Sequence, residues 1–406
     1  MDEKGSILMK IIVSVGGRFH AFYLAKELFE KGYCKKLITS YPKFALKRYG
    51  IPVDKVDSII IKEVLERGYN KLPFFLRRKF NPEFYINGLF DKLAAKRVDE
   101  TDVFIGWASL SLYSMRKAKE YGAITILQRG NSHRHYQEEI LRQEYERLGL
   151  EFHGSYSGLV ERDIAEYEEA DYIEVPSSFV KKTFVEKGIK ECKIIKGFRG
   201  VNLTEFKKKE KEDTKFRIIY AGAMSIRKGV HYLLEVFNDL NLPDSELLLI
   251  GPVKDKDEIK PFFRKYEGKY KWIGKVPQSS LSNYYSQGSV FILNSIEDGF
   301  GVVIPQAMSC ALPVICTTNT GGPDIITDGK EGFIIPIRDV DALKEKILFL
   351  YKNRSVCRDM GELACKKVKD FFSWQDYGKK IIAEYQVRLK RSQSKGLRKD
   401  AEENSV

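Results

Sequence analysis

Two adjacent cations follow a glycine turn in the second half of the chain. The stretch Ala221–Phe237 reads AGAMSIRKGVHYLLEVF: Gly222 marks a turn after an apolar run, and Arg227 and Lys228 precede an amphipathic helix. Cations held near a helix N-terminus can neutralise the charge that develops on a departing diphosphate. Because neighbouring Arg and Lys residues are also common in solvated loops, this pair alone leaves both interpretations open.

A second glycine turn lies near the start of the chain. In SVGGRF, Gly16 and Gly17 follow an apolar run and precede a helix that is expected to begin near His20. Glycine lets backbone N–H groups approach a phosphate closely, and the helix N-terminus adds partial positive charge. The pattern favours a phosphate-binding turn, although an ordinary tight turn between a strand and a helix would use the same residues.

The most informative stretch is Asn294–Pro336, NSIEDGFGVVIPQAMSCALPVICTTNTGGPDIITDGKEGFIIP. An acidic residue, a glycine, an aromatic residue and another glycine are followed by a glutamine, a small-residue helix and a strand. A generic strand, turn and helix would explain each glycine but not the whole string. The string resembles the donor-site signature of retaining glycosyltransferase family 4 (glycosyl transferases group 1), whose members have the GT-B fold.

The resemblance implies roles for the residues of this signature. In the family, a first acidic residue contacts hydroxyls of the donor sugar and a second holds the ribose hydroxyls of the nucleotide. Asp298 and Gln306 stand at these positions, so both family glutamates are substituted, and Phe300 and Gly301 lie between them. Gln306 still offers one carbonyl acceptor and two N–H donors to a ribose diol. Glu297 could take the acidic role if the loop shifts by one residue.

The phosphate loop departs from the family pattern as well. Family members commonly carry an arginine after the glycine of this loop, where this chain has Ala223, and Arg227 could supply the missing guanidinium. Lys228 carries over directly as a cation for the diphosphate. Val276, in WIGKVP, stands where family members contact the nucleotide base through backbone groups.

The resemblance also implies a histidine from the first half of the chain. Many family members place one after the strand that corresponds to Ile124–Gln128, facing the donor sugar across a cleft. His133, in RGNSHRH, is the candidate, with His135 and Arg129 as alternatives. A polar surface histidine at the start of a helix is the competing interpretation of His133.

The elements that must position these residues alternate in type along the chain. The runs predicted as strands are Lys10–Val15, Ile59–Ile61, Val103–Gly106, Ile124–Gln128, Phe216–Ala221, Glu246–Gly251, Val290–Asn294 and Pro313–Cys316. Helical patterns separate them, which is the βαβ rhythm of a parallel sheet. The charged stretch Phe206–Lys215 interrupts this rhythm and cannot enter a core without a large desolvation cost. The sequence therefore predicts two α/β lobes.

The family resemblance turns this plan into an α/β, GT-B architecture of two Rossmann-like, doubly wound parallel-sheet domains facing a central cleft. Residues 1–200 would form the acceptor lobe and residues 201–370 the donor lobe. Residues 371–385 would form a helix that crosses back to the first lobe. The tail 386–406 carries many basic and few apolar residues, so it is expected to be disordered.

The implied reaction moves a sugar from a nucleoside diphosphate sugar to an acceptor hydroxyl with retention of anomeric configuration. The acceptor would be a glycan, a lipid-linked sugar or a small molecule in the synthesis of a polysaccharide or glycolipid. The donor is a co-substrate, so neither a separate cofactor nor a metal is expected. The substitutions at Asp298, Gln306 and Ala223 keep a catalytically inactive sugar-nucleotide binder as an alternative.

Charge and composition restrict the partners and the compartment. The 69 Lys and Arg residues against 56 Asp and Glu residues give a net charge of +13, which favours anionic partners. A nucleic-acid or polyanion binder would fit this charge, but no recognisable nucleic-acid module is present. The six cysteines are scattered, the N-terminus is unlike a signal peptide, and Val302–Cys316 is too short to span a bilayer. We expect a cytoplasmic protein.

Contact with a membrane would therefore be peripheral. The stretch Tyr69–Tyr85, YNKLPFFLRRKFNPEFY, mixes aromatic side chains with Arg77, Arg78 and Lys79 and would suit an anionic lipid interface. A helix that buries its aromatic residues and exposes its charges is an equally good interpretation.

Overall fold

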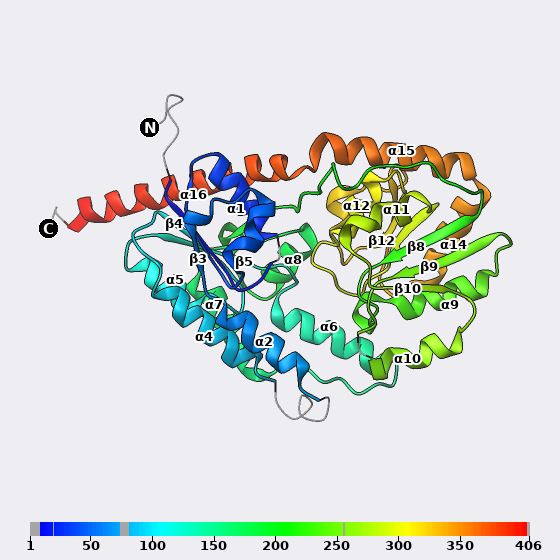
Figure 1. The fold of residues 1–406 in the computed structure, drawn as a ribbon, viewed down its shortest axis with the longest axis horizontal. Coiled ribbons are helices and arrows are strands. Elements are labelled where there is room, and N and C mark those ends of the chain that lie inside the picture. The colour runs from blue at the N-terminus through cyan, green and yellow to red at the C-terminus, as the bar shows by residue number, and fades with distance from the viewer. Residues whose placement is uncertain (1–8, 19, 74–80, 255, 404–406) are drawn as a thin grey trace.

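The computed structural model describes residues 9–18, 20–73, 81–254 and 256–403, and the first lobe is built on a seven-stranded parallel sheet (Figure 1). The sheet order is β3-β2-β1-β4-β5-β6-β7. Its strands are β1 (Ile11–Val15), β2 (Cys34–Thr39), β3 (Val56–Ser58), β4 (Val103–Trp107), β5 (Ile124–Gln128), β6 (Tyr172–Val175) and β7 (Ile194–Lys196). Its helices are α1 (Ala21–Glu30), η1 (Lys43–Tyr49), η2 (Val53–Lys55), α2 (Ile61–Lys71), α4 (Glu83–Ala95), α5 (Leu112–Lys119), α6 (Arg134–Arg147), α7 (Ser157–Glu169), α8 (Ser178–Glu186) and η3 (Glu191–Lys193).

The second lobe repeats this plan on a six-stranded parallel sheet of order β10-β9-β8-β11-β12-β13. Its strands are β8 (Phe216–Ala221), β9 (Ser245–Ile250), β10 (Lys271–Gly274), β11 (Val290–Leu293), β12 (Val314–Thr317) and β13 (Gly332–Ile335). Its helices are η4 (Ile226–Lys228), α9 (Val230–Leu240), α10 (Lys256–Lys265), η5 (Gln278–Ser280), α11 (Leu281–Ser286), α12 (Val303–Ser309), α13 (Gly322–Ile325), α14 (Val340–Lys352) and α15 (Arg354–Phe371).

The apolar composition of the strands explains this layering. Central strands such as β1 (IIVSV) and β11 (VFIL) are buried along their whole length, as expected when helices cover both faces of a parallel sheet. In α9, Leu233, Leu234 and Phe237 face the core, as the helical pattern predicts. The predicted fold class is confirmed. One strand prediction is wrong: Ile59–Ile61 follows β3 and leads into α2, and Ile60 and Ile61 are exposed.

Both sheets place a topological switch point beside their first strand. In the first lobe the strand order reverses between β1 and β4, and in the second lobe between β8 and β11. Ligands of open α/β sheets bind outside the carboxyl ends of the strands at such points. The loops that carry Gly16 and Gly222 leave the carboxyl ends of β1 and β8, so the fold brings both predicted glycine turns to switch points.

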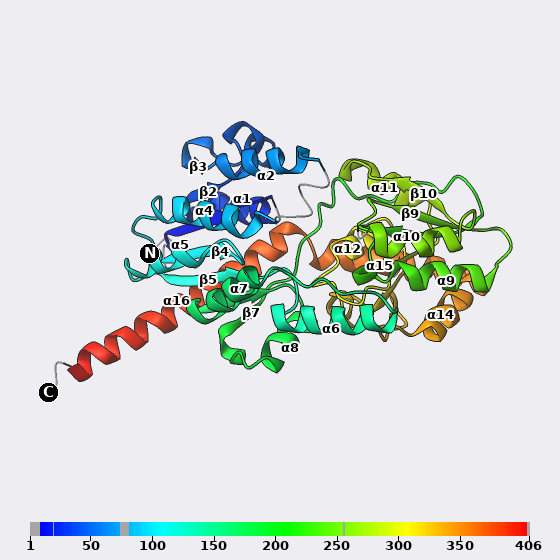
Figure 2. The same cartoon turned by 90° about the horizontal axis from the view of Figure 1, so that it is seen from below.

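The last helix, α16 (Trp374–Glu403), leaves the second lobe and runs along the first one (Figures 1 and 2). Tyr377, Ile381, Tyr385 and Leu389 recur every four residues on one helix face and are buried in the core of the first lobe. The structure differs here from the expectation of a disordered tail, because residues 386–403 are helical. Leu389 packs into the core of the first lobe. The charged composition of the tail gave no sign of this apolar contact.

Within the described ranges, no helix is both long enough and apolar enough to cross a membrane. The membrane interpretation of Tyr69–Tyr85 rested on Arg77, Arg78 and Lys79, which lie outside the described residues.

Candidate active site

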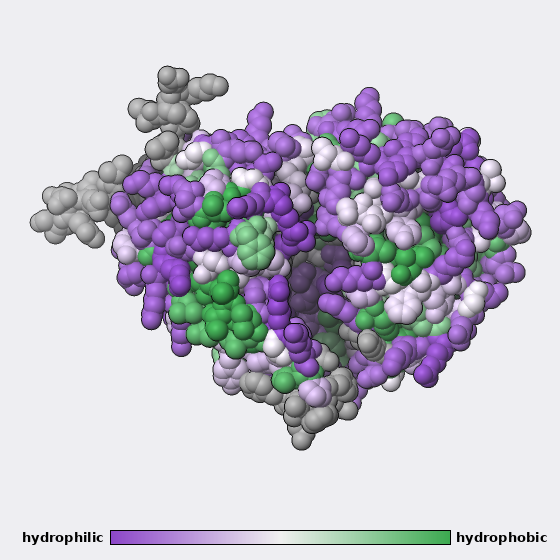
Figure 3. Space-filling model, viewed as in Figure 1, coloured by the Kyte–Doolittle hydropathy of each residue, from purple (hydrophilic) through white to green (hydrophobic). Residues whose placement is uncertain are grey.

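A cleft of about 1030 Å³ separates the two lobes, and Figure 3 shows it as a hollow between their polar surfaces. Loops after β1, β4 and β5 line it from the first lobe, and loops after β8 and β11 line it from the second. Gly16, Gly17 and Gly222, all predicted as phosphate-binding positions, lie in its walls. The carboxyl ends of both sheets therefore face one common cavity.

Lys228 and Asp298 form an ion pair inside this cleft. The loop after β11 holds Asp298, whose Oδ1 accepts hydrogen bonds from the backbone N–H groups of Gly301 (3.0 Å) and Phe300 (3.3 Å). Gly301 has a φ of +70°, which a residue with a side chain would adopt only with strain. Burial lowers the pKa of Lys228 and outweighs the opposing effect of Asp298, so a second anion nearby would favour its charged form.

Arg227 and Glu297 form a parallel ion pair that does not line the cleft. The Glu297 carboxylate is fully buried and accepts hydrogen bonds from Arg227 (2.9 Å), from Ser132 N (3.0 Å) and Oγ (2.9 Å), and from Gln137 Nε2 (2.9 Å). Burial alone would raise the pKa of Glu297, but Arg227 and these hydrogen bonds lower it to about 2.

This pair corrects two predictions. Arg227 was expected to face the diphosphate, but Glu297 engages its guanidinium behind the cleft wall. Glu297 was the alternative to Asp298 as the acidic residue of the site, yet it contacts the opposite lobe and leaves the cleft to Asp298. Two consecutive cations thus pair with two consecutive carboxylates. The Arg227–Glu297 pair lies between the lobes, and the Lys228–Asp298 pair faces the cavity.

Gln306 lies one helical turn into α12 and lines the cleft with Phe300 and Gly301. Among the described residues, its Oε1 is one of the few buried side-chain atoms without a hydrogen-bond partner. A buried amide oxygen is costly to leave unpaired, so this atom is a natural acceptor for a ligand. Val276 packs against the core of the second lobe and does not line the cleft, whereas Gln278, two residues later, does.

His133 does not face the cleft, which corrects its prediction as a catalytic residue. It is the N-cap of α6: its Nδ1 accepts a hydrogen bond from His135 N (3.3 Å), and its own N–H donates to Thr183 Oγ1. Its ring packs against Tyr167 and Phe184 in the interior of the first lobe. Burial, followed by the charges of its neighbours, lowers the pKa of His133 to about 4, so the ring is neutral.

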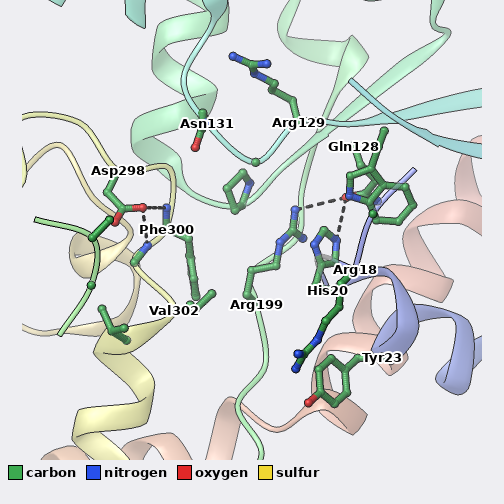
Figure 4. A pocket seen from close by; sticks show the side chains of 18 of the residues that line it. Arg18, His20, Tyr23, Gln128, Arg129, Asn131, Arg199, Asp298, Phe300 and Val302 are labelled. Carbon is green, nitrogen blue, oxygen red and sulfur yellow. Dashed lines mark hydrogen bonds between the residues drawn. The ribbon is translucent and has the colours of Figure 1, made fainter. Parts of the chain in front are cut away.

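Arg129 and His135 were the two alternatives to His133. Neither of them points its ionisable group into the cleft. Arg129 contributes to the cleft wall, but Figure 4 shows its guanidinium turned away from the cavity, where Asp163 binds it at 2.9 Å. His135 does not line the cleft.

The histidine in the cleft is His20, which the sequence showed only as the start of a helix (Figure 4). Its Nε2 lies 3.2 Å from Gln128 Oε1, which can only accept, so the proton sits on Nε2. Burial and the nearby Arg199 lower the pKa of His20 well below its usual value. The position of His20 shortly after the Gly16–Gly17 turn is a sequence signal that could have identified it as a cleft residue. No local signal pointed to Arg199.

Arg199 and Gln128 belong to a network around the buried carboxylate of Glu174. Arg199 (3.0 Å) and Gln128 (2.6 Å) both donate hydrogen bonds to this carboxylate, as do the hydroxyls of Tyr377 (2.9 Å) and Tyr385 from α16. Arg199 also donates to Gln128 Oε1 (3.3 Å), the atom that orients His20. The terminal helix therefore supports the cleft residues of the first lobe from behind.

Solved structures share this two-lobed arrangement. Sucrose-phosphate synthase from Thermosynechococcus elongatus superposes with a TM-score of 0.69 at 16% identity, covering 94% of this chain and 100% of that one. Anabaena HepE in complex with UDP superposes with a TM-score of 0.66 at 14% identity, covering 93% and 100%. The fold is that of GT-B glycosyltransferases.

Sequence comparison matches most of the second lobe to a known family. Residues 202–367, which carry Lys228 and the Asp298–Gln306 signature, match the family model of glycosyl transferases group 1. The second lobe of this chain therefore resembles members of this family. The capsular polysaccharide biosynthesis glycosyltransferase CapM of Staphylococcus aureus is 28% identical over 254 residues. That match covers 57% of this chain and spans 65% of the length of CapM.

Proposed function

We propose that this protein is a retaining glycosyltransferase that moves a sugar from a nucleoside diphosphate sugar to an acceptor hydroxyl. The observation that carries the proposal is the Lys228–Asp298 ion pair, set in the cleft beside the family signature. No other described carboxylate approaches Lys228 within ion-pairing distance, so a bound diphosphate would compete with Asp298 alone for this cation.

The pair suggests how the donor is bound. When the diphosphate takes Lys228 as its counter-ion, Asp298 is released to accept hydrogen bonds from the sugar hydroxyls. Gln306 then accepts a ribose hydroxyl with its unpaired Oε1. The charge that develops on the leaving diphosphate is stabilised by Lys228, a cation already in place before the reaction, which is the usual source of such stabilisation.

The relatives suggest which donor and acceptor to test first. We infer a uridine diphosphate sugar as the first donor to test, because HepE was crystallised with UDP. CapM acts in capsular polysaccharide synthesis, which favours a glycan or lipid-linked acceptor. We propose a cytoplasmic enzyme with peripheral contact to an anionic membrane, where a lipid-linked acceptor would be reached. Metal-independent transfer, as the family resemblance implies, completes the proposal.

The test begins with a thermal-shift screen against uridine, guanosine and adenosine diphosphate sugars, since a ligand that binds only the folded state raises its apparent stability. Turnover of the stabilising donor is then compared for Lys228→Ala and wild type. Loss of one preorganised electrostatic group costs roughly 2.7–4 kcal/mol of barrier, so turnover should fall by about 10²–10³.

Lys275→Ala is the matched control, because Lys275 is an exposed lysine of the same lobe that does not line the cleft. It should retain wild-type turnover. Full turnover by a folded Lys228→Ala protein would rule out the proposed role in leaving-group departure. Binding of the donor without any turnover by wild type would favour the inactive sugar-nucleotide binder.

A further inference from the structure

A second pocket, of about 510 Å³, opens beside the cleft where the chain crosses between the lobes. We call it the hinge pocket. Segments of α1 and η1, the crossover 201–204 and the start of α16 form its walls. It shares five lining residues with the cleft, so the two cavities adjoin: Arg18, Tyr23, Val201, Asn202 and Trp374.

Close backbone packing fixes the two crossover segments that contribute to the hinge pocket. Val201 N donates to Phe372 O at 2.9 Å, which ties the two crossovers together. At Gly200, a Cβ atom would lie 2.7 Å from the backbone of Trp374, so only glycine permits this approach. Ligand sites are usually formed before the ligand arrives, and this pocket fits that description.

The pocket carries positive charge that lacks a counter-ion. Arg18 and Arg48 form no ion pair with any carboxylate in the described parts of the chain. Both guanidinium groups lie over the ring of Tyr49, at 5.8 and 5.0 Å from its centre. Glu27, the carboxylate in the lining, is bound to Lys31 at 3.1 Å. Two guanidinium groups that contact the same aromatic ring and lack an anionic partner are suited to binding a phosphate.

Aromatic rings form the wall between the two cavities. Tyr23 stacks on Trp374 with their rings nearly parallel at 4.4 Å, and Tyr49 meets Tyr23 edge-on at 5.7 Å. Figure 4 shows Arg18 and Tyr23 together at the edge of the cleft. Flat aromatic surfaces have an apolar face and a polar edge, which suits a ligand that combines a ring with a charged group.

The lining of the hinge pocket favours an occupant other than the donor. None of the donor-signature residues, such as Lys228, Asp298 and Gln306, lines the hinge pocket, although all three line the cleft. A ligand that reaches from the cleft into the hinge pocket therefore passes along the first-lobe wall, through Arg18 and Tyr23.

We propose that the hinge pocket binds a phosphate group carried by the acceptor, with Arg48 and Arg18 as its ligands. The claim that the phosphate belongs to an acceptor rests on the proposed function, whereas the phosphate site itself rests only on the pocket. The phosphate could belong to a water-soluble sugar phosphate or to a lipid headgroup, and the two sources are distinguished by experiment.

The experiment measures phosphate binding by calorimetry in the Lys228→Ala background, which weakens the competing anion site in the cleft. Arg48→Glu is compared with Lys47→Glu, because Lys47 is the exposed neighbouring cation on η1 and does not line the pocket. We expect Arg48→Glu to weaken binding of inorganic phosphate at least about tenfold, because a charge-assisted bidentate contact is lost. Lys47→Glu should change phosphate binding little. Arg48→Gln serves as a milder second variant.

The second arm measures cosedimentation with phosphatidylcholine vesicles that contain phosphatidic acid. Parallel loss of vesicle and phosphate binding in Arg48→Glu would identify a lipid phosphate, whereas loss of phosphate binding alone would identify a soluble one. Equal phosphate affinity in Arg48→Glu and Lys47→Glu, or no saturable phosphate binding at all, would overturn the proposal. Binding of UDP is measured separately in the wild type, so failure of the proposed function remains distinguishable.

Discussion

Gln306 and Asp298 lie in the same cleft, but their side-chain oxygens are engaged differently. The Oε1 of Gln306 is buried without a partner, whereas Asp298 already accepts hydrogen bonds from Gly301 and from Lys228. A ligand therefore gains a new hydrogen bond at Gln306 but must exchange an existing partner at Asp298. This difference predicts a division of labour between the nucleotide and the sugar.

We expect Gln306→Ala to weaken binding of free UDP by roughly 0.5–1.5 kcal/mol per lost hydrogen bond. Gln306→Glu should bind UDP at least as well as wild type, because a carboxylate can accept from both ribose hydroxyls. Asp298→Ala should impair transfer without weakening affinity for free UDP, because the diphosphate no longer competes with this carboxylate for Lys228. Calorimetry with free UDP measures all three, and nucleotide affinity controlled by Asp298 instead of Gln306 would contradict the assignment.

His133 is assigned a structural role, and its protonation tests that role. Its pKa is about 4 in the folded protein against about 6.5 in an unfolded chain, so the unfolded state binds more protons below pH 6.5. The stabilisation is complete above pH 6.5 and is lost as pH falls from about 6.5 to about 4. The stabilisation amounts to at most about 3–4 kcal/mol.

His133→Asn should remove this part of the pH dependence while keeping the N-cap of α6, since Asn is a favoured capping residue. Urea unfolding between pH 4 and 7 measures the effect. Turnover at pH 7 should stay close to wild type, and a collapse of turnover in a stable His133→Asn protein would restore the catalytic interpretation.

At the scale of elements, α16 connects the core of the first lobe to the cleft. The hydroxyls of Tyr377 and Tyr385 reach the buried carboxylate of Glu174, which also binds Arg199 and Gln128. Burial, together with contact with this anion, raises the pKa of both tyrosines well above the usual value, so both hydroxyls remain donors.

Tyr385→Phe should destabilise the protein by roughly 1.5–3 kcal/mol, because a buried carboxylate loses one hydrogen bond. Urea denaturation with a fixed m-value measures the change. Tyr121→Phe, at an exposed tyrosine of the same lobe, should change stability by less than about 0.5 kcal/mol. Equal stability of the two variants would show that α16 contributes only its apolar face.

At the scale of the whole molecule, two buried carboxylates hold the lobes together. Glu297 of the second lobe accepts from Ser132 and Gln137 of the first. Glu144 of the first lobe binds Tyr232 (2.8 Å) and Arg338 of the second. At Gly299, a Cβ atom would lie 1.8 Å from the Gly130 carbonyl oxygen of the other lobe. The cleft residues therefore depend on an interface in which buried polar contacts lie beside an apolar cluster built on Ile140, Tyr232 and Ile296.

Glu297→Gln should loosen this interface, because an amide cannot balance the half-buried Arg227 guanidinium. We expect a larger radius of gyration by small-angle scattering and a fall in turnover greater than the fall in UDP affinity. Glu139→Gln on α6 is the control, since Glu139 pairs with Lys187 within the first lobe and is exposed. Unchanged scattering and turnover would show that Glu297 does not join the lobes.

The pH dependence of stability gives a second measure of Glu297. Its pKa of about 2 lies below the value near 4.5 of an unfolded chain, so its contribution is present above pH 4.5. That contribution is lost as pH falls from about 4.5 towards 2 in the wild type and should be absent in Glu297→Gln.

The sequence by itself determined the two α/β lobes, the glycine turns after β1 and β8, and the signature from Asp298 to Gln306. These features are local: apolar periodicity sets strands and helices, and glycine sets turns, within a few residues of chain. Parallel strands then force the turns to the same edge of each sheet, so Gly16, Gly222 and Lys228 reach one cleft.

Only the tertiary structure decided which side chains enter that cleft. Whether His133 or His20 faces the cavity depends on the direction in which each loop leaves its strand. Whether Arg227 meets a phosphate or Glu297 depends on the approach of the opposite lobe, which supplies Ser132. Arg199 reaches its place through Glu174 and α16, partners far away in the chain. Such contacts are set by packing between distant segments, and local patterns in the sequence carry no record of them.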